Sequence, residues 1–236
     1  MQVDILTIFP RMFDAVLGES ILKRAQAAGR LSITLHDLRD FTHDRHRTVD
    51  DRPFGGGPGM VMKPEPIFEA IEHLLGQEGA RRRPAGCQVV LMSPQGERLT
   101  DALAHELGRL DRLVLIAGRY EGVDARVNVL VDRVVSIGDY VLTGGELPAM
   151  VLLDAAARYI PGVLGHAEAT AEESFVNGLL EYPHYTRPAV YRDLAVPEVL
   201  RSGDHPAVSR WRKLQSLART LVARPDLLRR APSQPK

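Results

Sequence analysis

Glycine-containing loops that follow apolar segments are the residues of this chain best suited to hold a small molecule. SPQG begins at Ser93, GRYEG at Gly118 and IGDYVLTGGE at Ile137, each after a short apolar run. If those runs are parallel strands, their carboxyl ends meet at one sheet edge, where open α/β sheets bind ligands. Such loops offer backbone N–H and C=O groups and few fixed charges, which suits a flat, polar heterocycle such as adenine. Each loop alone says little, since every strand must end in a turn.

A second ligand candidate is the segment 50–60, which contains two aspartates, an arginine and three consecutive glycines. Glycine lets the backbone approach a ligand closely or adopt positive φ angles. The carboxylates and the guanidinium beside the glycines could position a polar substrate. The same composition also suits a loop that only needs unusual turns, so both interpretations stay open.

Two adjacent carboxylates, Glu172 and Glu173, follow a stretch of small residues that begins at Pro161. A carboxylate on such a segment can act as a general base if it is drawn into a pocket. The alternative is a solvated acidic loop, and the pattern alone does not exclude it.

Several common catalytic signatures are missing from the sequence. It has no Gly-Lys dipeptide for a Walker-type phosphate loop, no HExxH zinc motif, no GxSxG elbow and no GxGxxG fingerprint. A single cysteine, Cys87, forms neither an internal disulfide nor a CxxC metal site. The usual nucleotide, serine-hydrolase and zinc chemistries are therefore disfavoured.

The elements that must position these residues alternate along the chain. Five short apolar segments predict strands, and segments with helical spacing between and after them predict helices. This alternation indicates an α/β fold with a mostly parallel sheet covered by helices on both faces. The predicted strands are 2–9, 31–35, 87–92, 113–117 and 133–137, and the predicted helices are 11–28, 64–76, 100–110, 146–160 and 206–222.

Composition places the chain among ordinary globular proteins. It has 236 residues, of which 44% are hydrophobic and 25% charged. No apolar run approaches the ~18 residues of a membrane span, and the N-terminus has no secretory-signal pattern. With a single cysteine, a reducing, cytoplasmic location without membrane association is expected.

Charge is distributed unevenly although the formal net charge is +0. Residues 187–236 contain 11 Lys or Arg against 4 Asp or Glu, and the preceding residues contain 19 against 26. A basic tail on an acidic body points to a polyanionic partner, although a solvated arginine-rich helix is the alternative. We expect a domain over residues 1–160, a flexible linker over 161–175 and a small helical domain over 176–236.

Taken together, these segments resemble the bacterial tRNA (guanine-N1)-methyltransferases that modify guanosine 37 beside the anticodon. The resemblance covers almost the whole chain, and the block IGDYVLTGGELPAM is its most specific part. The matching stretches are 41–62, SPQG at Ser93, GRYEG at Gly118, the block at Ile137, IPGVLG at Ile160, SFVNGLLEYPHYTRP at Ser174, SGDHPAV at Ser202 and RWRKLQSLART at Arg210.

The resemblance implies a fold that local sequence patterns do not suggest. Members belong to the SPOUT class, in which a trefoil knot in the α/β domain forms the S-adenosylmethionine pocket. Threaded connections are so rare that sequence rules would not propose one. The resemblance further implies an obligate homodimer with active sites shared between the chains, and activity supported by Mg²⁺, for which no ligand spacing marks a site.

The resemblance also assigns binding residues. The substrate-binding residues expected for tRNA are Asp50, Arg187, Arg210, Arg212 and Lys213. The expected S-adenosylmethionine pocket comprises Met92, Ser93, Pro94, Gln95, Gly118, Tyr120, Glu121, Ile137, Gly138, Asp139, Tyr140, Val141, Leu142, Gly144, Gly145 and Pro148.

Two catalytic residues follow from the resemblance in the same way. The catalytic arginine falls on Arg158 and the general base on Glu173, where the family usually has an aspartate. The longer side chain could shift the reacting oxygen by about an ångström, an error that can matter kinetically, and Glu172 could share the role. A carboxylate would accept the N1 proton of guanine while a guanidinium stabilises charge on O6. Cys87, in a buried strand, is not expected to act as a nucleophile.

The sequence disfavours two other functions. An RNA-binding module without catalysis would show damaged loops at Gly118 or Ile137, and both loops are intact. A SPOUT methyltransferase acting on ribosomal RNA or on a ribose 2′-OH would not be expected to match the blocks that follow Ser174. Both features favour the guanosine-37 family.

Overall fold

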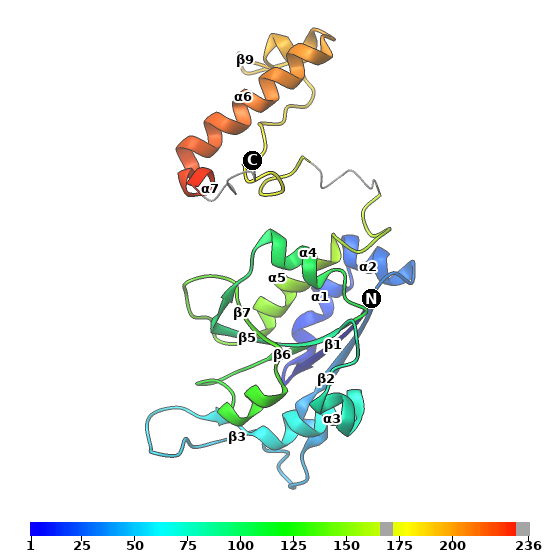
Figure 1. Cartoon of the computed structure of the whole chain (residues 1–236), viewed down its shortest axis with the longest axis vertical. Helices are drawn as coiled ribbons and strands as arrows, with labels where there is room; N and C mark the ends of the chain where they lie inside the picture. The colour runs from blue at the N-terminus through cyan, green and yellow to red at the C-terminus, as the bar shows by residue number, and fades with distance from the viewer. Residues whose placement is uncertain (166–171, 230–236) are drawn as a thin grey trace, which may run out of the picture. The chain divides into compact units, whose positions relative to one another are not determined.

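The computed structural model describes residues 1–165 and 172–229. The chain divides into two compact units, residues 1–165 and residues 166–236 (Figure 1). No helix in the described ranges is both long enough and apolar enough to cross a membrane.

The first unit is built on a five-stranded sheet with the strand order β2-β1-β6-β5-β7, and every neighbouring pair is parallel. The predicted α/β class with a parallel sheet is therefore confirmed. The strands are β1 (Gln2–Thr7), β2 (Ser32–Asp37), β5 (Cys87–Arg98), β6 (Arg112–Ala117) and β7 (Arg133–Ser136).

Helices cover both faces of this sheet (Figure 1). Along β6, Leu113 and Leu115 pack into one apolar cluster, and Val114 and Ile116 pack into the other. Successive strand residues point to opposite faces, which explains why the central strands are apolar throughout. The first cluster also takes residues of α2 (Ser20–Ala27), α4 (Asp101–Leu107) and α5 (Glu146–Ala157), and the second takes residues of α3 (Pro64–Arg81) and the 3-10 helix η3 (Ala125–Leu130).

The continuous helix expected over residues 11–28 is wrong. The segment forms the 3-10 helix η1 (Pro10–Phe13), α1 (Asp14–Leu17) and α2. Gly18 ends α1 with its N–H bonded to the carbonyl of Asp14 at 3.0 Å, and Ser20 has a positive φ of 51°. Apolar spacing does not register such a break, because the two short helices still bury a common face.

The SPQG segment lies inside a strand, which corrects the expected loop between residue 92 and the next helix. β5 continues to Arg98, and both Met92 and Glu97 pair with Val135 of β7. Residues 93–96 are therefore extra on one strand and form a bulge. The bulge lies at the carboxyl-end edge where the other two loops emerge.

The glycine-rich segment is held at both ends by a short antiparallel pair, β3 (Asp50–Asp51) and β4 (Val61–Met62). Gly55, Gly56, Gly57 and Gly59 have φ values of 87°, 80°, 120° and 84°. Residues with a Cβ are strained at such positive φ angles, so the turns alone account for these glycines.

The second unit contains one long helix, α6 (His205–Ala223), followed by α7 (Pro225–Arg229). Asp204 caps α6 by accepting from the N–H of Ala207 at 2.9 Å. Thr220, fully buried, accepts from the N–H of Leu180 at 2.9 Å and ties the preceding segment to α6. A hairpin of β8 (Val190–Tyr191) and β9 (Leu194–Ala195) and the 3-10 helix η4 (Glu198–Arg201) complete it.

The linker expected over residues 161–175 is divided between the two units. Residues 161–165 belong to the first unit and residues 172–175 to the second. Residues 166–171, the middle of the expected linker, lie outside the described residues.

Candidate functional site

A pocket of about 420 Å³ lies in the first unit where β5, β6 and β7 end. The bulge of β5, the loop after β6 and the loop after β7 all contribute to its lining. Every residue expected in the S-adenosylmethionine pocket lines it except Asp139. The Asp139 carboxylate instead pairs with the guanidinium of Arg98.

Some lining residues have no counterpart in the sequence expectations. Ala125 and Asn128 come from η3, a helix that no sequence pattern marked, and Arg119 lies inside a motif that was otherwise assigned. The sequence signal that could have identified these three residues as part of the pocket is their position inside or just after GRYEG.

The loops after β6 and β7 are joined to each other through backbone contacts. The N–H of Gly145 donates to the carbonyl of Gly118 at 2.7 Å, and Arg119 forms an isolated bridge with Gly144. A Cβ on Gly145 would lie 2.8 Å from Cα of Ala117 and from N of Gly118. Glycine is therefore required at position 145 for the two chain segments to come this close.

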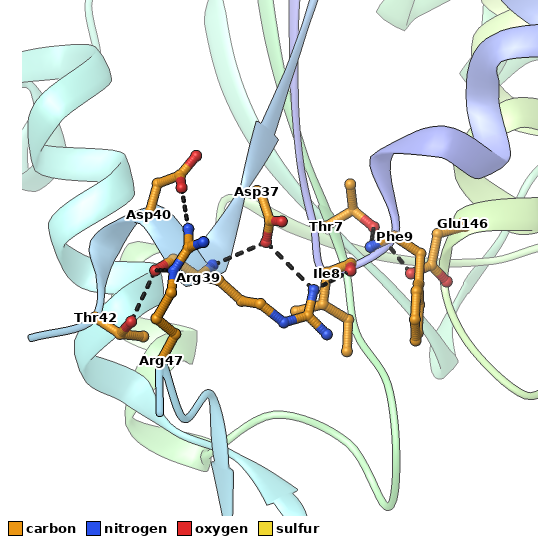
Figure 2. A network of polar contacts seen from close by, with 9 residues as sticks. All are labelled: Thr7, Ile8, Phe9, Asp37, Arg39, Asp40, Thr42, Arg47 and Glu146. Atoms are coloured by element: carbon orange, nitrogen blue, oxygen red, sulfur yellow. Dashed lines mark hydrogen bonds and ion pairs between the residues drawn. The ribbon is translucent and has the colours of Figure 1, made fainter. Parts of the chain in front are cut away.

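A buried ion pair also holds the loops after β6 and β7 together. Glu146 is 0% exposed, and its carboxylate accepts from Arg119 Nε at 2.8 Å and from Thr7 Oγ1 at 2.9 Å. Thr7 Oγ1 in turn accepts from the N–H of Phe9 at 2.9 Å (Figure 2). A buried carboxylate needs such partners, because an unpaired buried charge is costly.

The guanidinium of Arg119 also covers an aromatic ring. Its central carbon lies 4.6 Å from the ring centroid of Phe9, within the range of a cation–π contact. The central carbon of the Arg39 guanidinium lies 5.6 Å from the same centroid, and Arg39 also bonds to the carbonyl of Ile8 and pairs with Asp37 (Figure 2). Two arginines thus contact the segment that follows β1.

The charge of the pocket lining is set by few groups. Arg119 is neutralised by Glu146, and Glu121, which has an exposed side chain, is the one carboxylate among the lining residues of the part of the chain that the structure describes. This balance favours a ligand that carries a positive charge.

Tyr120 connects the pocket to Asp50. The pKa of Tyr120 is raised by burial, and further by the charge of Asp50 and a hydrogen bond to it. Asp50, expected to bind substrate, therefore lies beside a residue of the pocket lining. The N–H of Glu121 donates to the carbonyl of Met60 at 3.0 Å, which fixes the end of the glycine-rich segment to the same loop.

Arg158 does not line this pocket. It caps the carboxyl end of α5, whereas Gly145 and Pro148 reach the pocket from the amino end. The helix has 12 residues, so its ends are about 18 Å apart at 1.5 Å per residue. Leu147 and Val151 are 50% and 47% exposed, and Arg158 follows Val151 at a spacing of seven residues, on the same face of α5.

The two glutamates belong to the second unit. The carboxylate of Glu172 accepts from the hydroxyl of Tyr182 at 2.9 Å. Burial raises the pKa of Tyr182, and the hydrogen bond to Glu172 raises it further. Glu173 is half-buried. Glu172 thus has a structural partner within its own unit.

The remaining residues expected to bind tRNA also lie in the second unit. Arg210 and Lys213 are exposed on α6, and the guanidinium of Arg212 lies 4.6 Å above the ring of Tyr182. Arg187 and Arg212 line a second cavity of about 740 Å³. Among residues 1–165 and 172–229, no group of three or more His, Cys, Asp or Glu side chains could hold a metal ion.

Comparison with known proteins gives one consistent result. The family model described as tRNA (Guanine-1)-methyltransferase TrmD matches residues 1–230. The tRNA (guanine-N(1)-)-methyltransferase of Moorella thermoacetica is 56% identical over 237 residues, covering 100% of this chain and 93% of that protein. The proteins of the same name from Chloroflexus aggregans and Thermomicrobium roseum are 57% and 53% identical, covering 98% and 100% of this chain and 89% and 86% of their own lengths.

Proposed function

The chain belongs to the tRNA (guanine-1)-methyltransferase family, and from this membership we propose that it transfers a methyl group from S-adenosylmethionine to N1 of guanosine 37 in tRNA. The observation that carries the proposal is the pocket at the carboxyl ends of β5, β6 and β7, lined by the bulge of β5 and by the loops after β6 and β7.

The residues of this pocket fit the methyl donor. Its volume of about 420 Å³ falls within the ~300–1,000 Å³ of small-molecule sites. The glycines let backbone groups reach a flat adenine and its ribose. Glu121, as the unneutralised carboxylate of the lining, complements the positive sulfonium.

The chemistry is assigned to Glu173 and Arg158. Bound S-adenosylmethionine supplies a methyl group on a positively charged sulfur. Guanine N1 carries a proton and is a poor nucleophile until that proton leaves. Glu173 accepts the proton as general base, and Arg158 stabilises the negative charge that builds on O6.

The active site is shared between two chains of a homodimer. Arg158 lies about 15 Å along α5 from Pro148, which lines the pocket of its own chain. The exposed face of α5 carries Leu147 and Val151 together with Arg158. A second copy packed on this apolar face brings Arg158 of one chain toward the pocket of the other.

The two units divide the work. Residues 1–160 bind the donor, and the chain passes through a trefoil knot where residues 137–145 return from β7, at the sheet edge, to the end of β6. Residues 176–236 form the tRNA-binding domain, which uses Arg187, Arg210, Arg212 and Lys213. Residues 161–175 link the two domains. The enzyme acts in the cytoplasm, where its tRNA substrate is found. Mg²⁺ supports activity at a site that is not assigned to particular residues.

Methyl transfer to defined transcripts tests this function. An unmodified tRNA transcript with guanosine 37 is incubated with the protein and labelled S-adenosylmethionine, beside the same transcript with adenosine 37. Label on N1 of guanosine 37 and none on the control is expected. Equal labelling of both transcripts, or label on ribose, would contradict the proposal.

A further inference from the structure

The second unit contains a cavity that is larger than the donor pocket. Its volume is about 740 Å³, against about 420 Å³. Every residue that lines it lies between Tyr182 and Arg212, and none of them lines the donor pocket. The proposed transfer reaction does not account for this open cavity.

Three guanidinium groups line this cavity, from Arg187, Arg201 and Arg212. Among residues 172–229, no Asp or Glu lines it. Within the described part of the chain, the guanidinium groups of Arg187 and Arg201 have neither an ion-pair nor a hydrogen-bond partner, and Nε of Arg212 is buried without one. Two other lining residues contact carboxylates: Tyr182 donates to Glu172, and His184 pairs with Glu181. The lining is therefore cationic and suits an anion.

Aromatic rings also line this cavity, beside the guanidinium groups. The ring of Tyr182 is covered by the Arg212 guanidinium at 4.6 Å. Tyr185 is 50% exposed, and its ring centroid lies 6.4 Å from that of Trp211 at a tilt of 54°. One ring thus supports a guanidinium, and the other offers an open side to a ligand.

We propose that this cavity holds one unpaired nucleotide of the tRNA, other than the guanosine that is methylated. Arg187, Arg201 and Arg212 contact its phosphate, and the base stacks on Tyr185. Single-stranded nucleic acid is commonly bound by such a combination of cationic groups and stacking rings. The cavity falls in the ~300–1,000 Å³ range of small-molecule sites, so it accommodates a base as well as a phosphate.

Among the described residues, the cavity and the donor pocket share no lining residue, so the proposal gives the cavity a binding role and not the methyl transfer itself. The inference rests on the proposed function, since it takes tRNA as the substrate. It adds a base-stacking contact to the cationic tRNA-binding residues proposed for the second unit.

Affinity for an unmodified tRNA transcript, measured with full-length protein, tests the stacking contact. Tyr185→Ala is expected to weaken binding by about 5- to 100-fold, the usual effect of losing one base-stacking ring. Tyr185→Phe keeps the ring and is expected to bind like the wild type. Tyr191→Ala is the matched control, because Tyr191 is 58% exposed in the same unit and does not line the cavity.

Salt dependence tests the phosphate contacts. Arg187→Gln with Arg201→Gln is expected to lower the slope of log affinity against log salt by about 1.4, or ~0.7 for each contact to single-stranded phosphate. Tyr185→Ala is expected to leave this slope unchanged. Arg192→Gln is the control, since Arg192 packs on Tyr191 outside the cavity.

Three outcomes would overturn the inference. The first is an equal loss of tRNA affinity in Tyr185→Ala and Tyr191→Ala. The second is a loss of affinity in Tyr185→Phe as large as that in Tyr185→Ala. The third is ultraviolet crosslinking of Tyr185 to guanosine 37 itself. Measurements on the wild-type protein distinguish failure of this inference from failure of the proposed function. Wild-type protein that methylates guanosine 37 while Tyr185→Ala binds normally contradicts the cavity alone, whereas wild-type protein that neither binds nor methylates tRNA contradicts the proposed function.

Discussion

Arg119 and Glu146 form an ion pair of 2.8 Å in which the carboxylate is fully buried. Arg119 belongs to the loop after β6, and Glu146 is the first residue of α5, directly after the loop from β7. Their contact therefore fixes the two loops of the pocket relative to each other. The same carboxylate accepts from Thr7, so strand β1 is fixed to this junction as well.

Glu146→Gln is expected to impair both stability and donor binding. The substitution keeps the size of the side chain and removes the charge that Arg119 needs. The free energy of unfolding should fall by about 1.5–3 kcal/mol, the usual range for a hydrogen bond to a charged group. Affinity for S-adenosylmethionine, measured by calorimetry, should fall by about tenfold, or ~1.4 kcal/mol.

Glu97→Gln is the control for Glu146→Gln. Glu97 pairs with Arg133 at 3.1 Å, but its side chain is 53% exposed. Exposed pairs contribute about 0–1 kcal/mol, so this variant should keep both stability and donor affinity. Equal effects in the two variants would show that burial of Glu146 has no special role.

Gly145→Ala is expected to weaken donor binding. The added Cβ would lie 2.8 Å from the backbone of Ala117 and Gly118, so the loop must move. A displacement of about 1 Å can cost ~10²-fold in rate, and calorimetry should show weaker donor binding. Gly165→Ala is the control, because no atom lies within 4 Å of its Cβ position. Normal donor affinity in Gly145→Ala would place the donor elsewhere.

Glu173→Gln is expected to slow single-turnover methyl transfer by about 10²–10⁴-fold, the usual contribution of a general base. Affinity for tRNA should not change, because the amide has the shape of the carboxylate. Glu173→Asp should remain active. A collapse of the rate in Glu172→Gln with a normal rate in Glu173→Gln would instead identify Glu172 as the base.

Arg158→Ala is expected to slow the reaction by about 10²–10³-fold through lost stabilisation of charge on O6. Mixing this variant with Gly145→Val, after unfolding and refolding together, tests whether Arg158 acts on the partner's pocket. A mixed dimer then has one intact pocket facing one intact arginine, and activity should return. If Arg158 served its own chain, neither site of the mixed dimer would be complete and the mixture would stay inactive.

Stability at low pH is expected to depend on Asp4. This residue is 1% exposed and contacts His36 and Arg112, each at 2.9 Å. Burial by itself would raise the pKa of Asp4, but hydrogen bonds from His36 and Arg112 and the Arg112 charge outweigh it and leave the pKa below 3.8. The contribution of Asp4 is therefore present above pH 3.8 and is lost as pH falls through its folded pKa.

Urea unfolding of Asp4→Asn at several pH values measures this contribution. The variant should be less stable than the wild type at pH 7, and the difference should shrink below about pH 3.8. Asp139→Asn, which removes an exposed partner of Arg98, should change stability by less than about 1 kcal/mol. A difference for Asp4→Asn that does not vary with pH would contradict the prediction.

Much of the fold follows from local sequence. The apolar run of β6 predicts a strand buried on both faces, and Leu113 and Val114 do face opposite clusters. Thr100, a residue type preferred at the start of a helix, caps α4, and its side chain accepts from the N–H of Leu103 at 3.2 Å. Such features can be predicted because strand burial and helix capping depend on residues only a few positions apart.

The sequence by itself determined the α/β class, the parallel sheet and the two loops that follow β6 and β7 at its edge, since apolar periodicity and glycine position are local properties. Only the tertiary structure decided the break at Gly18, the resumption of β5 at Glu97 and the pairing of Arg119 with Glu146. These relationships join residues whose contact depends on how strands and helices pack, and no spacing along the chain encodes that packing.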